Sequence, residues 1–130
     1  MIDFNGVRLG FQNETRYIGH MVVVTGANGF IGSALVWELN QKAQKNLLLV
    51  DMVDLKERTP LLSKKSYSEF VQADDFLKNL ELRHSKTPFS WIIHMGACSS
   101  TLELNEAYLQ RVNFEYTQTL WRFCCEKRIP

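Results

Sequence analysis

Four short runs rich in apolar residues stand out along the chain, at positions 21–24, 47–50, 69–72 and 89–94. Apolar runs of this length, without strict alternation, are typical of strands that are buried on both faces of a parallel sheet. The run at 69–72 is the weakest, since only Phe70 and Val71 in it are apolar. The pattern therefore predicts four short strands, the first of which follows a mixed segment of twenty residues.

Between these runs, apolar residues recur at the spacing of an α-helix. The core face of the first predicted helix consists of Ile31, Ala34, Leu35 and Leu39. A second, short helix is expected over Asp74–Leu82, with its acidic start as the cap of the helix N-terminus. The last and longest predicted helix has a core face made of Leu104, Ala107, Tyr108, Val112, Leu120, Phe123 and Cys124.

Strands and helices thus alternate along residues 21–130, which is the order found in α/β folds. The simplest arrangement is a Rossmann-type doubly wound parallel sheet with strand order 3-2-1-4, joined by right-handed crossovers. We expect the sheet to be incomplete and the chain to be truncated, since the fourth strand would form an edge where such sheets normally continue. Residues 1–20 show no periodicity and are expected to form an N-terminal arm of unknown role.

The composition is that of one ordinary globular domain, with 130 residues of which 45% are hydrophobic and 22% charged. Fifteen basic and fourteen acidic side chains give a net charge of +1, which offers no electrostatic basis for binding nucleic acid or an anionic membrane. No apolar run reaches the roughly 18 residues that span a bilayer. The three cysteines, two of them adjacent, indicate no disulfide framework, and we expect a cytoplasmic protein.

Three glycines follow the first predicted strand at a spacing that suits a bound diphosphate. Gly26, Gly29 and Gly32 form the pattern T-G-x-x-G-x-x-G between a predicted strand and a predicted helix. Glycines at these positions permit a tight turn and let a pyrophosphate approach the backbone at the helix N-terminus. A strand-to-helix turn without a ligand is the alternative, but the correct elements on both sides favour a dinucleotide site.

An acidic residue ends the second predicted strand. Asp51 follows the glycines by about 20 residues, the spacing at which a carboxylate accepts hydrogen bonds from the adenosine ribose of NAD. It is alternatively a turn or cap residue. Lys56 and Arg58 follow closely, and a cation there can bind the 2′-phosphate of NADP, although both also suit a solvated loop. The residues themselves therefore leave both NADP and NAD open as cofactors.

Small and hydroxylated residues follow the fourth predicted strand. In the order 3-2-1-4, the segment Met95–Ser99 lies beside the glycine turn, in the crevice where ligands bind in such sheets. Gly96 and Ala97 leave space for the ribose next to the nicotinamide. Ser100 and Thr101, with the serine that precedes them, offer hydroxyl groups to phosphate, ribose or substrate. These three residues alternatively cap the last helix, and the two roles are compatible.

Three polar residues near the predicted crevice also have ordinary structural explanations. Cys98 invites a role as a nucleophile, but the sequence places no histidine beside it, and its small size suits a packed strand end. His94 ends a buried strand and is interpreted as a packing residue; the histidines show no metal-ligand spacing, so no metal site is predicted. The amide of Asn113, in the last helix, either bridges backbone groups near the crevice or lies exposed.

Two segments resemble a known family of enzymes. Residues 25–33, Thr-Gly-Ala-Asn-Gly-Phe-Ile-Gly-Ser, resemble the signature of the extended short-chain dehydrogenase/reductases, which include nucleotide-sugar epimerases and dehydratases. Residues 94–101, His-Met-Gly-Ala-Cys-Ser-Ser-Thr, followed by Glu103, Tyr108, Asn113 and Tyr116, are similar to the H-x-G-A-C-S-S-T stretch of the ADP-L-glycero-D-manno-heptose 6-epimerases. The resemblance covers residues 21–130, and its second segment is much the more specific.

The resemblance implies an NADP-preferring isomerase of lipopolysaccharide-core heptose synthesis. Such an enzyme transiently oxidises the sugar of a nucleotide-sugar substrate, here ADP-heptose, and returns the hydride on the other face, so the cofactor is regenerated in each turnover. The resemblance also implies a homo-oligomer for the full-length protein. The cofactor contacts carried over by position are Phe30, Ile31, Asp51, Met52, Met95, Gly96, Ala97, Cys98, Ser99 and Asn113.

The chain departs from the family pattern at two positions. Met52 stands where the family commonly has asparagine, which removes a polar contact near the 2′-phosphate, and Met95 stands where an acidic residue is typical. The family's catalytic serine or threonine and its Tyr-x-x-x-Lys pair are expected after Pro130, so no catalytic residue is assigned here. The tyrosine is the acid/base of this mechanism and the lysine lowers its pKa, so we expect these 130 residues alone to be inactive.

Two other functions remain open from the sequence. One is a different nucleotide-sugar epimerase or dehydratase, which would share the glycine pattern. The other is a non-catalytic dinucleotide-binding module that regulates a partner.

Overall fold

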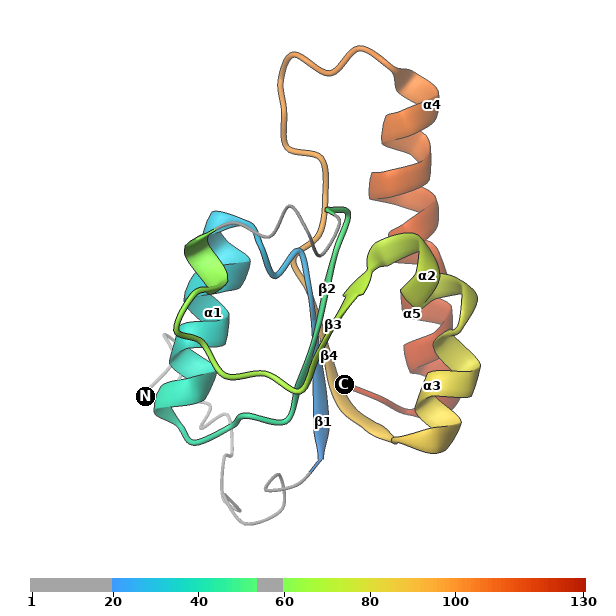
Figure 1. The fold of residues 1–130 in the computed structure, drawn as a ribbon. Helices are drawn as coiled ribbons and strands as arrows, with labels where there is room; N and C mark the ends of the chain where they lie inside the picture. The colour runs from blue at the N-terminus through green and yellow to red at the C-terminus, as the bar shows by residue number, and fades with distance from the viewer. Residues whose placement is uncertain (1–19, 54–59) are drawn as a thin grey trace, which may run out of the picture.

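The computed structural model describes residues 20–53 and 60–130 and contains a four-stranded parallel sheet (Figure 1). The strands are β1 (Met21–Thr25), β2 (Leu47–Asp51), β3 (Glu69–Gln72) and β4 (Phe89–His94). Their order is β3-β2-β1-β4, which confirms the predicted strands and the predicted order 3-2-1-4. Residues 1–19 of the predicted arm, and the cations Lys56 and Arg58, lie outside the described residues.

Alternation of side chains along the central strands explains why the sheet is covered on both faces. In β1, Val22 and Val24 belong to one hydrophobic cluster, whereas Val23 belongs to the cluster on the opposite face. The residues of β2 divide between the two clusters in the same way. The three valines are at most 5% exposed, and burying a side chain of this size contributes roughly 1.5–3 kcal/mol. The apolar runs therefore form strands without a solvated face.

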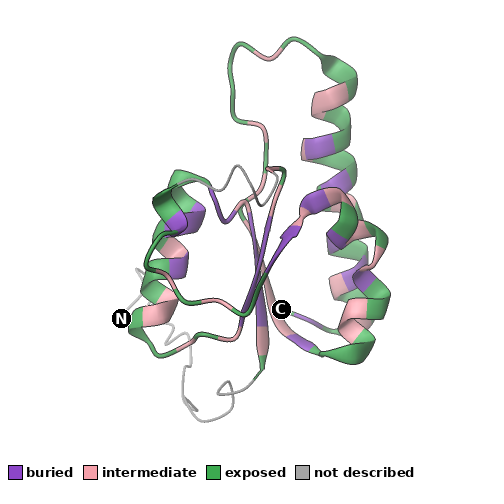
Figure 2. Cartoon of the chain, viewed as in Figure 1, coloured by how far each residue is buried: buried purple, intermediate pink, exposed green. Residues whose placement is uncertain are grey.

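Helices cover both faces of this sheet (Figure 1). On one face lie α1 (Phe30–Gln41) and the short 3-10 turn η3 (Pro60–Leu62). On the other face lie α2 (Ala73–Lys78), α3 (Leu80–Lys86) and α5 (Tyr116–Lys127). Figure 2 shows buried residues where the helices face the strands and exposed residues on their outer sides. Within the described part of the chain, no helix combines the length and apolar character needed to cross a membrane.

The buried face of α1 differs from the predicted one. Ile31 is 64% exposed and Ala34 is also exposed, whereas Val36 is completely buried. Gly32 explains the difference, because a Cβ at this position would lie only 2.0 Å from the carbonyl oxygen of Gly26. The helix therefore packs with its glycine side against the turn, and Ile31 lies outward. The predicted helix was right, but its predicted orientation was wrong at these two positions.

The predicted helix over Asp74–Leu82 is in fact two short helices, α2 and α3, with Asn79 between them. The Asn79 side-chain amide donates to the Asp75 backbone oxygen and to its carboxylate, both at 3.0 Å, which ends α2. The N-terminus of α2 is capped by Gln72, whose side chain accepts from the backbone N–H of Asp74 at 2.8 Å, and not by an aspartate as predicted. The acidic residues occupy the first turn, where they complement the helix dipole.

The last helical segment runs through α4 (Glu106–Leu109), the π-helical turn η4 (Gln110–Glu115) and α5. Leu104, predicted to lie on its core face, precedes the helix and is 87% exposed. The N-cap is Asn105, whose side chain accepts from the backbone N–H of Tyr108 at 3.0 Å. The alternative that Ser99, Ser100 and Thr101 cap this helix is therefore wrong, because the helix begins after them. Its buried residues are Val112, Tyr116, Leu120 and Phe123.

Candidate functional site

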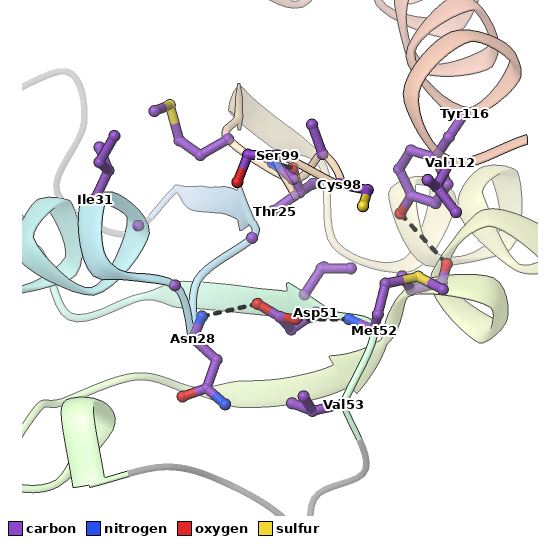
Figure 3. Close-up of a pocket in the computed structure, with 18 of the residues that line it drawn as sticks. Thr25, Asn28, Ile31, Asp51, Met52, Val53, Cys98, Ser99, Val112 and Tyr116 are labelled. Carbon is purple, nitrogen blue, oxygen red and sulfur yellow. Dashed lines mark hydrogen bonds between the residues drawn. The ribbon is translucent and has the colours of Figure 1, made fainter. Parts of the chain in front are cut away.

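A pocket of about 490 Å³ lies at the carboxyl ends of the strands (Figure 3). It is enclosed by the glycine turn after β1, the ends of β2 and β4, and η4. Because β1 lies between β2 and β4, three segments that are far apart in the sequence meet here. The predicted cofactor-binding residues that line the pocket are Gly26, Gly29, Phe30, Ile31, Gly32, Asp51, Met52, Met95, Gly96, Ala97, Cys98 and Ser99.

The glycine turn is closed by backbone contacts that leave no room for a side chain. Gly26 has a φ of 65°, which favours glycine, and a Cβ there would lie 2.7 Å from the backbone of Gly96. A Cβ on Gly32 would collide with the Gly26 carbonyl group, as described above. Gly29 is less crowded, since its Cβ would lie 3.3 Å from the same oxygen. All three glycines border the pocket, but only Gly26 and Gly32 are required by the packing of the turn.

The N-terminus of α1 borders the same pocket. Its N-cap, Gly29, makes no side-chain hydrogen bond, and its first turn contains no acidic residue. Phe30 and Ile31 occupy that turn with largely exposed side chains. The first backbone N–H groups of a helix have no intrahelical partner and carry partial positive charge. This end of α1 is therefore chemically suited to bind a phosphate oxygen.

Asp51, at the end of β2, holds its carboxylate at the floor of the pocket through two backbone hydrogen bonds (Figure 3). Its Oδ2 accepts from the N–H of Asn28 at 2.9 Å, and its Oδ1 accepts from the N–H of Met52 at 2.8 Å. The capping role considered from the sequence is thus present. Each carboxylate oxygen still has a lone pair for a further donor, so the carboxylate can also accept a hydroxyl group.

The segment after β4 lies directly against the glycine turn. The backbone N–H of Met95 donates to the Thr25 carbonyl oxygen, and that of Gly96 donates to Thr25 Oγ1, both at 3.2 Å. Ala97, Cys98 and Ser99 continue along the pocket. Ser100 and Thr101, the predicted substrate contacts, are exposed and are not among the residues that line it. The structure thus brings together the first part of this segment and leaves its last two hydroxyl groups outside.

Asn113 uses its side-chain amide to hold this segment. Its Oδ1 accepts from the backbone N–H of Cys98 at 2.7 Å, and its Nδ2 donates to the Cys98 carbonyl oxygen at 3.0 Å. This confirms the prediction that the amide bridges backbone groups near the crevice. Asn113 does not itself line the pocket, so its contact reaches the pocket through the backbone of Cys98.

His94, interpreted from the sequence as a packing residue, also makes two hydrogen bonds. Its Nδ1 lies 2.6 Å from Thr25 Oγ1 and its Nε2 lies 2.9 Å from Thr117 Oγ1. Its ring stacks on Tyr116 with centroids 5.8 Å apart. Burial lowers the pKa of His94 below its usual value of 6.5. The side chain is half-buried and connects two strands to a helix.

The sequence did not identify eight of the residues that line the pocket. The residues missed are Thr25, Asn28, Val50, Val53, Ala73, Tyr108, Val112 and Tyr116. Tyr108, Val112 and Tyr116 are spaced four residues apart, and this helical spacing was a signal for a common face. Tyr116 donates from its hydroxyl group to the Ala73 carbonyl oxygen at 3.3 Å. Burial, with the nearby carboxylates of Asp74 and Asp51, raises the pKa of Tyr116 far above its usual range.

The remaining chemical candidates give no second site in the described residues. Cys98, Cys124 and Cys125 are free thiols, and the hydrogen bonds of Cys98 described above are made by its backbone. Within residues 20–53 and 60–130, no group of three or more His, Cys, Asp or Glu side chains is placed to hold a metal ion.

The sequence profile of the 3-beta hydroxysteroid dehydrogenase/isomerase family matches residues 23–130. An ADP-L-glycero-D-manno-heptose-6-epimerase of Fusobacterium nucleatum is 38% identical over 109 residues, which are 84% of this chain and 33% of that protein. The chain therefore spans about one third of the length of this relative. The match confirms the resemblance to the heptose 6-epimerases.

Solved structures show the same arrangement of strands and helices. MoeE5 in complex with UDP-glucuronic acid and NAD superposes with a TM-score of 0.61 at 32% identity, covering 83% of this chain and 33% of that one. The ADP-L-glycero-D-manno-heptose-6-epimerase of Helicobacter pylori superposes with a TM-score of 0.64 at 23% identity. The match covers 85% of this chain and 37% of that one. The predicted Rossmann-type fold is confirmed.

Proposed function

The chain belongs to the 3-beta hydroxysteroid dehydrogenase/isomerase family, and we propose that its pocket binds a nicotinamide dinucleotide as part of a nucleotide-sugar epimerase. Residues 21–130 form the dinucleotide-binding domain in this proposal. When bound, the dinucleotide supplies the chemistry of accepting a hydride from the sugar and returning it.

The glycine turn is the observation that carries the proposal. A Cβ at Gly26 or Gly32 would fill the space in which the turn meets Gly96 and the start of α1. Such a contact brings bare backbone to the positive end of a helix, which is the arrangement a pyrophosphate requires. The residues present therefore fit a dinucleotide, and Asp51 fits its adenosine ribose.

We assign the remaining contacts by position in the pocket. The first turn of α1, with Phe30 and Ile31, binds the pyrophosphate through backbone N–H groups. Gly96 and Ala97 leave space for the nicotinamide end, because neither has a side chain larger than a methyl group. Cys98 contributes backbone and a small side chain there, and we assign it no catalytic role.

For the choice between the two dinucleotides, we propose NADP. The Asp51 carboxylate alone favours NAD, since a 2′-phosphate beside it would be repelled. Binding of NADP therefore depends on a cation, and Arg58 is our candidate. Arg58→Ala is expected to lower the affinity for NADP about tenfold or more while leaving the affinity for NAD unchanged. An equal loss for both dinucleotides would contradict this assignment.

For the sugar, we propose ADP-heptose, with Ser100 and Thr101, which are exposed and directly follow the pocket segment, as its contacts. The 38% identity to a heptose 6-epimerase supports this choice, while the similarity to MoeE5 with its bound UDP-glucuronic acid supports a UDP-sugar as the alternative. None of the four tyrosines is followed by lysine at the Tyr-x-x-x-Lys spacing. We therefore propose that these 130 residues bind the dinucleotide but do not epimerise a sugar. A cytoplasmic location and a full-length homo-oligomer remain predictions.

The proposal is tested by titrating the purified chain with NADP and with NAD in a calorimeter. We expect saturable binding of at least one dinucleotide, and a loss of about tenfold or more in the Gly29→Val variant, where the side chain crowds the pyrophosphate. Circular dichroism shows whether the variant is folded. Unchanged affinity in a folded Gly29→Val variant would contradict the pose. Binding by the full-length protein with no turnover of ADP-heptose or a UDP-sugar would favour the non-catalytic module.

A further inference from the structure

A continuous chain of hydrogen bonds passes through His94 and joins the two loops of the pocket to the last helix. The imidazole lies between Thr25, the residue before the glycine turn, and Thr117, in the first turn of α5. The Thr25 hydroxyl oxygen also accepts from the backbone N–H of Gly96 at 3.2 Å. Replacing the imidazole with a group that cannot hydrogen-bond would therefore break the chain at its centre.

The partners determine where the protons of the neutral ring lie. The carbonyl oxygen of Asn113, 2.8 Å from Thr117 Oγ1, can only accept, so the Thr117 hydroxyl donates to it. Thr117 Oγ1 is then an acceptor for His94, which requires a proton on Nε2. Nδ1 carries no proton in this tautomer and accepts from the Thr25 hydroxyl group. One arrangement of protons thus satisfies every member of the chain.

Both ends of the chain act on the same segment of the pocket. At one end, Thr25 holds the backbone N–H of Gly96. At the other, Asn113 holds both backbone groups of Cys98 with its side-chain amide. Asn113 lies in the π-helical turn η4, a feature that is frequent at functional sites. The segment from Gly96 to Cys98 is therefore held by Thr25, which bonds His94 directly, and by Asn113, whose backbone oxygen accepts from the Thr117 hydroxyl group that also faces His94.

We infer that His94 is a positioning residue of the pocket, whose neutral, Nε2-protonated ring holds the Gly96–Cys98 segment in place for the dinucleotide. This inference rests on the proposed function. Protonation of the ring would place a donor on Nδ1, and the two lone pairs of the Thr25 hydroxyl oxygen could then accept from both Nδ1 and Gly96. The Thr25 hydroxyl proton, however, would lose the acceptor that Nδ1 provides, so the imidazolium form leaves one donor of the chain without its partner.

The surroundings of His94 favour the neutral ring. Burial lowers its pKa. From α5 it faces the ring of Tyr116, and it shares an apolar groove with Cys124, Cys125 and Arg128. β1 contributes only the uncharged Thr25. No Asp or Glu side chain is among the described residues that line the groove.

The test compares the affinity of the chain for NADP and NAD at about pH 8 and at a pH below the lowered pKa of His94, which an NMR titration of the imidazole locates. We expect the wild type to bind roughly three- to tenfold more weakly at the lower pH, which corresponds to the loss of one hydrogen bond. His94→Phe keeps a ring against Tyr116 and is expected to bind weakly at both pH values. His94→Gln, which retains a donor and an acceptor, is expected to recover part of the affinity without the pH dependence.

Two further measurements test the role of His94 if the His94→Phe variant does not fold. Thr117→Val, at an exposed position, removes the acceptor of Nε2 and is expected to weaken binding at about pH 8. Imidazole ¹⁵N NMR of the wild type is expected to show the Nε2-protonated tautomer. An Nδ1-protonated ring, or unchanged affinity and pH profile in the folded variants, would overturn the inference. No dinucleotide binding by the wild type at either pH would instead overturn the proposed function.

Discussion

The two loops that enclose the pocket are held in place by different forces. The glycine turn after β1 is fixed by backbone packing, in which Gly26 lies against Gly96 and Gly32 lies against Gly26. The segment after β4 shares that backbone contact at Gly96, but beyond Gly96 it is held by a side chain, the amide of Asn113 on the backbone of Cys98. A steric contact between backbones cannot be relaxed locally, whereas a hydrogen bond contributes about 0.5–1.5 kcal/mol. A substitution in the first loop should therefore cause one large loss of stability. Substitutions in the second loop should each cause a small loss.

The largest effect is expected from Gly32→Ala. The new Cβ would lie 2.0 Å from the Gly26 carbonyl oxygen, so α1 must move away from the turn. We expect the free energy of unfolding to fall by about 3 kcal/mol or more in a urea titration. The matched control is Gly29→Ala, whose Cβ would lie 3.3 Å from the same oxygen and which should cost at most about 1 kcal/mol. Equal losses in the two variants would show that backbone packing does not distinguish these glycines.

A smaller effect is expected from Asn113→Ala, which removes two hydrogen bonds to Cys98. The loss should be about 1–3 kcal/mol, and the Cys98 amide should exchange its hydrogen faster. Asn105→Ala is the control, because it removes the cap at Tyr108 for about 1 kcal/mol without touching this segment. If the Cys98 amide keeps its protection in Asn113→Ala, the side-chain account of this loop is wrong.

Acid should weaken the second loop through His94. Because the folded-state pKa of His94 lies below 6.5, the unfolded chain binds the proton more readily. The stability from this residue is therefore present above pH 6.5 and is lost as the pH falls through the folded-state pKa. We expect the free energy of unfolding to fall less steeply with acid in His94→Gln than in the wild type. If the free energy of unfolding falls equally steeply with acid in the two proteins, His94 does not cause the acid sensitivity.

The smallest effect is expected from Tyr116→Phe, which keeps the ring stacked on His94 and removes only the hydroxyl group. The lost hydrogen bond to Ala73 is long, at 3.3 Å, so we expect a cost of no more than about 1 kcal/mol near neutral pH. The pKa of Tyr116 is raised, so its contribution is present below pH 10 and is lost in alkali. The variant should accordingly be less sensitive to alkali, and a stability profile parallel to the wild type above pH 10 would contradict this.

The strands and the glycine turn could be predicted because their signals are local. The run Val22–Val24 and the spacing of Gly26, Gly29 and Gly32 depend on residues close together in the sequence. The strand order then places Met95–Ser99 beside the glycine turn, as the pocket confirms. Twelve of the predicted cofactor contacts line that pocket, some expected from the glycine spacing and the strand order and others carried over from the family resemblance.

The helix faces could not be predicted to the same extent, because they depend on contacts across the fold. Ile31 is apolar and correctly spaced, but packing at Gly32 turns it outward. The last helix begins only at Glu106, where Asn105 caps it, so Leu104 lies outside the helix and is exposed although its spacing fits. The partners of His94 come from β1 and α5, and no local pattern marks them.

The central claim is that a dinucleotide binds over the glycine turn, between Asp51 and the segment after β4. Backbone amide shifts in ¹⁵N NMR spectra, followed while NADP and NAD are titrated into the chain, test this claim most directly. We predict that the large changes fall within residues 26–32, 51–53 and 95–99, which border the pocket. Large changes at Ile92, Trp121 and Cys125, in the groove between β4 and α5, with none at Gly29 or Ile31, would contradict it.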